Sequence, residues 1–276
     1  MPFLEIGSDR VHYLDEGREN APPVLMVHGS CGYAGQWRQL AEKLGAHYRV
    51  LRLDLPGMGD SDAMPIERQW TDEDDARAVS ALLDLVGTPL HFVGHSAGCI
   101  FSWRALAARP HRIQSLTLFE PVFFGLIADD PAFSFPRETA AGYVRLADAG
   151  DIAGAMTFFV DRWAGKEGAW AALPEKVKSL MMKGAGRLRH EWFNSGRDGF
   201  YPFDRAAWLQ ELSDTPTLLV QGTATVPAAA RVCDRFAELR PDTSRLHVPG
   251  AGHMVPFTHA PEVIAAVEAH LAGANG

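Results

Sequence analysis

The residues Gly94-His95-Ser96-Ala97-Gly98 place a serine where an apolar stretch gives way to a helical pattern. Leu90–Val93, just before them, is typical of a short buried strand, and Cys99–Arg109, just after them, is typical of a helix that Pro110 stops. A turn this tight accepts only small flanking residues and pushes the serine hydroxyl out above the sheet. The amides that open the helix would face any negative charge that develops there. The pattern predicts that Ser96 is a nucleophile. The alternative is an ordinary glycine-rich turn with Ser96 as the helix N-cap.

A serine hydroxyl is a weak nucleophile at neutral pH, so it needs a base within hydrogen-bond reach and a third group that orients this base. His253 lies in the glycine-rich loop Gly250–Met254, which follows the last candidate strand. Loops at the carboxyl ends of parallel strands converge at one edge of a sheet. We therefore predict that His253 is the base for Ser96. Two other histidines are expected to take no part in the chemistry, because His95 would point sideways inside the turn and His259 begins a surface helix.

Short apolar runs alternate with helical patterns along most of the chain. The candidate strands are Val24–Val27, Val50–Leu53, Leu90–Val93, Leu116–Phe119, Leu218–Val220 and Leu246–Val248. Runs that are apolar throughout suit parallel strands with both faces covered. Thr71 is predicted to cap a helix that continues to Val86, and the last helix begins near Pro261. The alternation predicts an α/β fold with a doubly wound, mostly parallel sheet, and Arg10–Leu14 belongs to an antiparallel hairpin at its edge.

One long segment, residues 122–213, contains no convincing strand. It is helical in pattern and rich in aromatic residues, and it is too long to be a loop. We expect a helical lid over the sheet, inserted into a core formed by residues 1–121 and 214–276. Most of its aromatic side chains must pack the lid itself. Phe123, Phe124 and Trp163 are predicted to line an apolar pocket that binds the substrate.

The bulk composition argues against several classes of partner. The chain has 276 residues, a net charge of −8 and no cluster of basic residues, so nucleic acid and anionic membranes are not expected partners. The first residues lack the pattern of a signal peptide, and no apolar run is long enough to span a bilayer. These observations favour a cytoplasmic protein, and the aromatic insertion favours a small apolar molecule as its partner. They leave the oligomeric state open.

The sequence shows no pattern that requires a cofactor or a metal ion. No Cys/His cluster has the spacing of a zinc site, and no glycine-rich phosphate loop is present. The three cysteines, Cys31, Cys99 and Cys233, are odd in number and widely spaced, which suits free thiols in a reducing compartment.

Over nearly its whole length the chain resembles the α/β-hydrolase fold superfamily. The resemblance is carried by four ordered motifs, namely Val27-His28-Gly29-Ser30, Asp54-Leu55-Pro56-Gly57-Met58-Gly59-Asp60-Ser61, the turn around Ser96, and Gly250-Ala251-Gly252-His253. In that family these motifs follow the third, fourth, fifth and eighth strands. The resemblance implies an eight-stranded sheet with the lid between strands six and seven.

The resemblance also implies where the oxyanion of an acyl-transfer reaction would be held. The backbone N–H of Ala97 and that of Ser30 or Cys31 would be the donors, and we take Ser30 as the partner of Ala97. Cys31 lies in the same loop and is expected to contact the substrate. His28 and Asp54 are expected to order their loops.

The chain departs from the family pattern at the acid that orients the base. The usual aspartate follows strand seven, and Thr225 stands in its place. Glu120, directly after strand six, is our predicted acid, because in the branch that resembles haloalkane dehalogenases some members carry a glutamate there. The alternative for Glu120 is an ion pair with an arginine at the sheet edge. Asp214 and Asp234 are less suitable, because Asp214 precedes strand seven and Asp234 lies on the following helix.

These residues predict a serine hydrolase that cleaves a carboxylic ester, or a similar acyl bond, of a small apolar substrate. Ser96 would attack, His253 would accept its proton, and Glu120 would stabilise the imidazolium. Carbon–halogen displacement is not expected, since the dehalogenases use an aspartate nucleophile, with a following tryptophan in the halide-binding cases. A C–C bond hydrolase, a cofactor-free perhydrolase and a ligand-binding protein without turnover are the alternatives. The missing aspartate after strand seven is the feature that favours the last.

Overall fold

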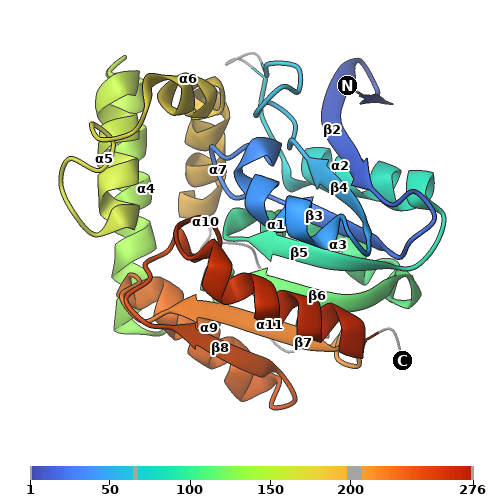
Figure 1. The fold of residues 1–276 in the computed structure, drawn as a ribbon. Helices are drawn as coiled ribbons and strands as arrows, with labels where there is room; N and C mark the ends of the chain where they lie inside the picture. Colours follow the sequence, from blue (N-terminus) through green and yellow to red (C-terminus); the bar gives the residue numbers. More distant parts are fainter. Residues whose placement is uncertain (1, 65–67, 198–206, 275–276) are drawn as a thin grey trace.

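A single mixed sheet organises the molecule, and the computed structural model describes residues 2–64, 68–197 and 207–274 (Figure 1). Its strands are β1 (Phe3–Ile6), β2 (Asp9–Gly17), β3 (Pro23–Val27), β4 (Arg49–Leu53), β5 (Leu90–His95), β6 (Ile113–Phe119), β7 (Thr217–Gly222) and β8 (Ser244–Val248). They are arranged in the order β1-β2-β4-β3-β5-β6-β7-β8. β2 pairs antiparallel with β1 and β4, and the other pairs are parallel. The predicted α/β class, the mostly parallel sheet and the hairpin at its edge are confirmed.

Helices cover both faces of the sheet. Because alternate residues of a strand point to opposite sides, each strand contributes side chains to two separate apolar clusters. In β3, Leu25 and Val27 belong to one apolar cluster, whereas Val24 and Met26 belong to another. The first cluster contains the apolar faces of α2 (Asp72–Val86), α3 (Ala97–Ala107) and α9 (Pro227–Leu239). The second contains those of α1 (Arg38–Leu44) and α11 (Ala260–Gly273), which lie in front of the sheet in Figure 1. This two-sided cover explains why the central strands, β3 to β7, are buried along almost their whole length.

Local signals fix the ends of the core helices. Thr71 and Asp74 form a capping box at the start of α2, and Gly87 ends that helix with a positive φ of 72°. The helix expected over Cys99–Arg109 begins and ends two residues earlier, at Ala97 and Ala107. It starts earlier because Ser96 is its N-cap. It ends before Arg109 because proline disfavours a helical conformation in the preceding residue, and Pro110 begins a separate 3₁₀ turn.

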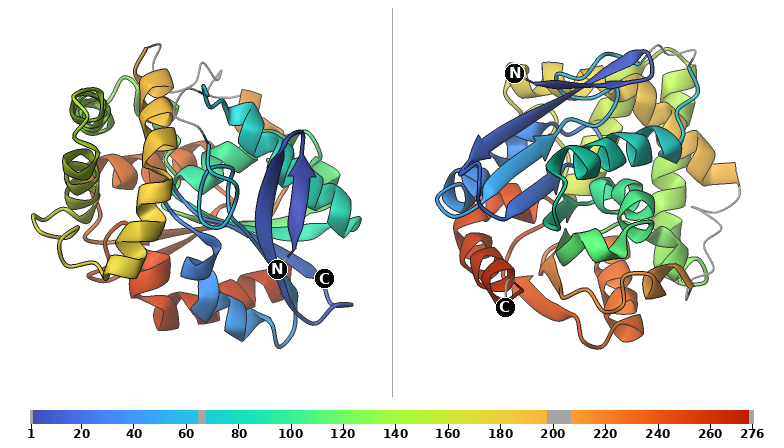
Figure 2. Two further views of the ribbon diagram at one scale, coloured as in Figure 1. Left: turned by 90° about the horizontal axis from the view of Figure 1, so that it is seen from above. Right: turned by 90° about the vertical axis from the view of Figure 1, so that its right-hand side faces the viewer.

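A helical insertion separates β6 from β7, where the sequence predicted one. Its helices are α4 (Ser134–Asp148), α5 (Ile152–Ala164), α6 (Glu175–Lys183), α7 (Ala185–Arg197) and α8 (Ala207–Gln210). Figure 1 shows α4 to α7 beside the ends of β5 and β7 that carry the arrowheads, and the views of Figure 2 agree. The described part of the segment contains no strand. The insertion therefore covers the edge of the sheet where the carboxyl ends of the parallel strands meet.

Two further observations concern the chain as a whole. No helix in the described part of the chain is both long and apolar enough to cross a membrane. The three cysteines are free and buried, so the expectation of free thiols agrees with the structure.

Candidate active site

Ser96 occupies a strained turn between β5 and α3. Its φ is 53° and its ψ is −124°, a conformation that costs a non-glycine residue about 1–3 kcal/mol. Glycine is needed two residues later, because a Cβ on Gly98 would lie 2.3 Å from the carbonyl oxygen of His28. The N-terminus of α3 can therefore approach the end of β3 closely. The turn holds the Ser96 side chain above the carboxyl edge of the sheet, as the sequence predicted.

His253 lies directly beside this serine. Its Nε2 is 2.9 Å from Ser96 Oγ. The backbone of His253 is fixed by His95, whose Nε2 is 2.9 Å from the His253 carbonyl oxygen. Burial and the neighbouring His253 hold the pKa of His95 well below its usual range, so the neutral ring donates this hydrogen bond from Nε2. His95 therefore has a positioning contact with the base.

Glu120 reaches the other nitrogen of the same imidazole. Its Oε2 is 2.7 Å from His253 Nδ1, and the Glu120 side chain is fully buried. The carboxylate is held by two further donors, the backbone N–H of Gly222 at 2.8 Å and the hydroxyl of Thr225 at 2.5 Å. Glu120 has a positive φ of 43°, which turns the chain out of β6 at this point. The structure thus brings the predicted serine, histidine and glutamate into one hydrogen-bonded series.

Thr225 is a site residue whose contribution the sequence analysis missed. It stands where the family has an aspartate, and we interpreted it only as the loss of that acid. Its hydroxyl donates to the same Glu120 oxygen that contacts His253. The position after β7 therefore still faces the base, although it now supplies a donor. The available signal was that threonine keeps a hydrogen-bonding group at this place.

The loop after β3 lies against the serine. A Cβ on Gly29 would be 2.9 Å from the Cβ of Ser96, so only glycine allows this approach. Ser30 and Cys31 follow in the loop, and both line the same cavity as Ser96 and Ala97. Cys31 has a positive φ of 55°, and burial raises the pKa of its thiol well above the usual range. The thiol therefore stays protonated and does not compete with Ser96 as a nucleophile.

A cavity of about 420 Å³ opens beside Ser96, between the sheet and the insertion. Its apolar lining is contributed largely by the insertion and α3, and it includes Ile100, Phe124, Phe159, Val160, Trp163, Leu173, Val177 and Met181. The charged side chains in its described lining, apart from histidines, are Lys166 and Glu191. The size and the apolar walls suit a small molecule.

Three of the four residues expected to contact the substrate line this cavity, and Phe123 does not. Cys31, Phe124 and Trp163 are part of its wall. The ring of Phe123 stacks on Phe236 at 5.8 Å and meets the edge of Trp103 at 5.3 Å. Phe123 is thus a core residue under α9, and its expected contact with the substrate is wrong. Adjacent residues in a tight turn point in different directions, so only one of the pair Phe123 and Phe124 can face the cavity.

Trp163, at the end of α5, brings the insertion into contact with the base. The centres of the Trp163 and His253 rings are 4.3 Å apart, with 32° between their planes. Trp163 is 7% exposed and His253 5% exposed. The insertion therefore shields the imidazole from solvent.

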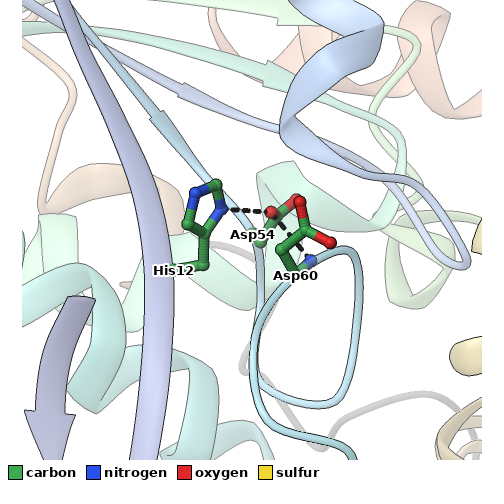
Figure 3. A group of neighbouring side chains, drawn as sticks. All are labelled: His12, Asp54 and Asp60. Carbon is green, nitrogen blue, oxygen red and sulfur yellow. Dashed lines mark hydrogen bonds and ion pairs between the residues drawn. The ribbon is translucent and has the colours of Figure 1, made fainter. Parts of the chain in front are cut away.

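A second group of ionisable residues, His12, Asp54 and Asp60, takes no part in the lining of the cavity (Figure 3). Its ligand-type atoms are within 4.8 Å of one another, which is close enough to suggest a metal site. The Asp54 carboxylate, however, already accepts hydrogen bonds from the backbone N–H groups of Ala34 and Asp60, and His12 Nδ1 is 2.6 Å from its Oδ2. These bonds tie together the loops after β3 and β4. The group is therefore explained by the expected loop-ordering role of Asp54.

The geometry around Ser96 allows acyl transfer. A base and an orienting carboxylate are in place, and the hydroxyl faces an apolar cavity. Ala97, at the start of α3, and Ser30 and Cys31, in the loop after β3, line the same cavity. The series Ser96–His253–Glu120 is complete with this one carboxylate.

Comparisons with known proteins give the family and related activities. The family model described as "alpha/beta hydrolase fold" matches residues 22–260. N-formylmaleamate deformylase from Pseudomonas putida is 27% identical over 258 residues, which cover 90% of this chain and 87% of that protein. The 2-hydroxy-6-oxononadienedioate/2-hydroxy-6-oxononatrienedioate hydrolase 2 from Pseudomonas putida is 36% identical over 114 residues, which cover 40% of this chain and 39% of that protein.

Solved structures give the same fold. The crystal structure of an esterase from Rhodococcus sp. ECU1013 has a TM-score of 0.74 to this chain at 19% identity, covering 98% of this chain and 97% of the other. At that level of identity the likeness establishes the arrangement of the elements, and the activity has to be argued from the site.

Proposed function

Since this chain belongs to the alpha/beta hydrolase fold family, we propose that it is a serine hydrolase that cleaves a carboxylic ester, or a similar acyl bond, of a small apolar substrate. The observation that carries the proposal is the series Ser96–His253–Glu120, with 2.9 Å and 2.7 Å between the hydrogen-bonding atoms, at the wall of an apolar cavity. Acyl transfer needs each of these groups, and each is in hydrogen-bond contact with the next.

The proposed reaction proceeds through an acyl-enzyme. Ser96 Oγ attacks the substrate carbonyl while His253 Nε2 takes the hydroxyl proton, and Glu120 stabilises the imidazolium at Nδ1. The tetrahedral intermediate then collapses, and the leaving alcohol takes the proton from His253. A water molecule, deprotonated by His253, attacks the acyl-enzyme, and collapse of the second intermediate releases the acid and regenerates Ser96.

The amides of Ala97 and Ser30 are the proposed oxyanion donors. Ala97 opens α3, where the first N–H groups have no partner within the helix, and Ser30 lies in the loop that Gly29 brings against the nucleophile. Preorganised donors of this kind contribute about 3 kcal/mol each to transition-state stabilisation. We further propose that the helical insertion is a lid, because its side chains form the apolar cavity wall and Trp163 covers His253.

A fluorophosphonate probe tests the nucleophile. We expect it to label the wild type at Ser96 and to leave Ser96→Ala unlabelled. Ser102→Ala is the matched control, because Ser102 lies on the same helix and its hydroxyl has no partner among the described residues. Equal labelling of wild type and Ser96→Ala would contradict the assignment. A series of p-nitrophenyl esters with acyl chains of increasing length would then define the substrate class.

Hydrolysis of a C–C bond next to a ketone is the second candidate, favoured by the similarity to the 2-hydroxy-6-oxononadienedioate hydrolase. Both reactions would use the same serine, histidine and acid. The wild type should be assayed against p-nitrophenyl butyrate and a vinylogous diketone ring-cleavage product. A higher kcat/KM for the diketone would reverse our preference. Binding without turnover loses its main support, since the acid that seemed missing after β7 has a counterpart in Glu120, 2.7 Å from the base.

A further inference from the structure

A buried series of charged groups connects the helical insertion to the loop beside Ser96. Arg187, on α7, makes a bidentate ion pair with Asp75 of α2, in which its Nη1 and Nη2 donate to Oδ1 and Oδ2 at 2.8 Å and 2.5 Å. Its Nε donates to Glu191 Oε1 at 2.6 Å, one turn further along α7. The other oxygen of Glu191 accepts the hydroxyl of Ser30 at 2.7 Å. We call Asp75, Arg187 and Glu191 the buried ionic network.

The network is almost wholly buried, with Glu191 at the wall of the cavity, so its members hold one another in place. The side chains of Arg187 and Asp75 are fully buried, and that of Glu191 is 5% exposed. Burial would lower the pKa of Arg187, but its two carboxylate partners raise it above the ordinary value, so the guanidinium remains charged. A charge in this setting must keep its partners, because an unpaired buried ion is strongly unfavourable. Arg187 also donates to the carbonyl oxygen of Pro56 at 2.6 Å, which fixes it to the core.

Glu191 connects the network to Ser30, whose backbone N–H we propose as an oxyanion donor. Ser30 lies between Gly29, whose missing Cβ lets the loop touch Ser96, and Cys31, which has a positive φ. The position of such a loop depends on what holds its side chains. The Ser30 hydroxyl is bonded to a carboxylate that cannot move without breaking a buried ion pair. A charge-assisted hydrogen bond of this kind is stronger than one between neutral groups.

We propose that Glu191 is a positioning residue that holds the Ser30 backbone N–H in the oxyanion hole. Through the buried ionic network it also couples this hole to the packing of α7 against the core. The inference rests on the proposed function. It assigns Glu191 no contact with the reacting atoms, and its role is to act through Ser30. The network anchors α7 to α2 and to the loop after β4, so that the lid and the oxyanion loop are fixed by one set of bonds.

Two variants test the bond, since one removes it and the other removes the charge that strengthens it. Ser30→Ala keeps the backbone amide and leaves the ionic network intact, whereas Glu191→Gln keeps the size of the side chain and removes its charge. We measure kcat and KM for p-nitrophenyl butyrate, the rate constant of fluorophosphonate labelling, and Tm. Each variant is expected to lower kcat and the labelling rate about tenfold, with KM within about twofold, because small displacements of catalytic groups act on the transition state. Ser30→Thr, which keeps the hydroxyl, should recover at least half of the lost activity.

The double variant and a matched control separate positioning from a general loss of structure. If the hydrogen bond carries the effect, Ser30→Ala/Glu191→Gln is no slower than the slower single variant. The control is Asp148→Asn. It breaks an exposed ion pair between Asp148 of α4 and Arg189, which lies on α7 as Glu191 does, and neither residue lines the cavity. It should leave kcat and the labelling rate unchanged. Ser30→Ala tests the bond even if Glu191→Gln lowers the Tm, because every charge stays paired in that variant.

The possible failures are distinguishable. If the wild type neither reacts with the probe nor hydrolyses any ester, the proposed function fails, and the inference fails with it. If the wild type is active through Ser96 but Ser30→Ala and Glu191→Gln match it in kcat and labelling rate, only the inference is overturned. The inference would also be overturned if the loss of kcat in the double variant equalled the product of the two single losses, or if the variants changed KM alone.

Discussion

Two buried histidine–carboxylate pairs in this molecule are nearly identical in geometry and different in setting. Glu120 and His253 are 2.7 Å apart, and Asp54 and His12 are 2.6 Å apart. All four side chains are at most 5% exposed. In both pairs it is Nδ1 that meets the carboxylate, and in both the carboxylate also accepts a backbone N–H. The distance between the two groups therefore does not distinguish a catalytic pair from a structural one.

The second ring nitrogen marks the difference. His253 Nε2 is 2.9 Å from Ser96 Oγ, at the wall of a cavity. His12 Nε2 is buried and has no hydrogen-bond partner among the residues that the structure describes, and its ring lies 5.3 Å from Phe3. The His253 imidazole can pass a proton to a substrate, whereas the hydrogen bonds around Asp54 end at the His12 imidazole. A histidine–carboxylate pair is thus a candidate for catalysis only where its free nitrogen meets a nucleophile and an open space.

Removing each histidine gives the largest expected contrast. We expect His253→Gln to lower kcat by about 10⁴- to 10⁶-fold, because the variant has no base for Ser96. His12→Gln, which keeps a donor for Asp54, should remain within about twofold of the wild type. Steady-state kinetics on p-nitrophenyl butyrate measures both. Comparable losses of kcat in the two variants would remove the distinction between the pairs.

The carboxylate of the first pair should be nearly as important. We expect Glu120→Gln to lower kcat by about 10⁴-fold, since the imidazolium loses its stabilising charge. Asp234→Asn is the control, because Asp234 is paired with Arg245 on the surface. In Glu120→Gln/Thr225→Asp the acid returns to the position after β7, and at least tenfold of the loss should be regained. A near-normal kcat for Glu120→Gln, with a loss in Asp234→Asn, would assign the role to Asp234.

The carboxylate of the second pair should affect folding more than catalysis. Asp54→Asn should lower the free energy of unfolding by about 2–4 kcal/mol, because buried donors lose a charged acceptor. We would measure it by urea denaturation, with kcat of the folded fraction unchanged. A large loss of kcat without loss of stability would move Asp54 into the active site.

The same carboxylate gives a pH dependence of known sign. Burial raises the pKa of Asp54. The hydrogen bond with His12, the electrostatic effect of His28 and the backbone N–H donors together lower it by more, so the net pKa is below the ordinary value. Its contribution to stability is therefore present above the unfolded-state pKa of about 4 and is lost as the pH falls toward the folded-state value. The difference in unfolding free energy between wild type and Asp54→Asn should shrink below about pH 4.

Loss of the Thr225 hydroxyl should have a smaller effect. Thr225→Val keeps the shape of the side chain and removes one of the donors to Glu120 Oε2, while the Gly222 N–H remains. We expect kcat to fall about three- to tenfold, within the usual contribution of one hydrogen bond to a charged group. Thr225→Ser should restore most of it. An unchanged kcat in Thr225→Val would mean that Gly222 alone orients the acid.

The rings that cover the two histidines should give the smallest contrast. Trp163→Leu opens the contact with His253 and should lower kcat about two- to fivefold, because water then weakens the electrostatic interactions of the base. Phe3→Leu removes the corresponding ring from His12 and should change nothing measurable in kcat. Equal effects of the two substitutions would show that the ring over His253 only contributes to packing.

Much of the fold could be predicted because its signals are local. The apolar runs gave the positions of β3 to β8, and the pattern from Thr71 to Val86 gave both ends of α2. The turn around Ser96 was recognisable from five consecutive residues. Phe123 could not be assigned in this way, since the direction of one ring in the turn after β6 depends on where Phe236 and Trp103 pack. Glu191 was missed because nothing in the sequence links α7 to the loop after β3.

The sequence by itself determined the family resemblance, the serine, the histidine and the place of the insertion, because each is a short motif or a periodic pattern. Only the tertiary structure decided which carboxylate meets His253, what Thr225 does, and where the network of Arg187 ends. Glu120 and His253 are 133 residues apart, and Ser30 and Glu191 are 161 apart. Such contacts depend on the order of strands in the sheet and on the seating of the insertion, which no local pattern encodes.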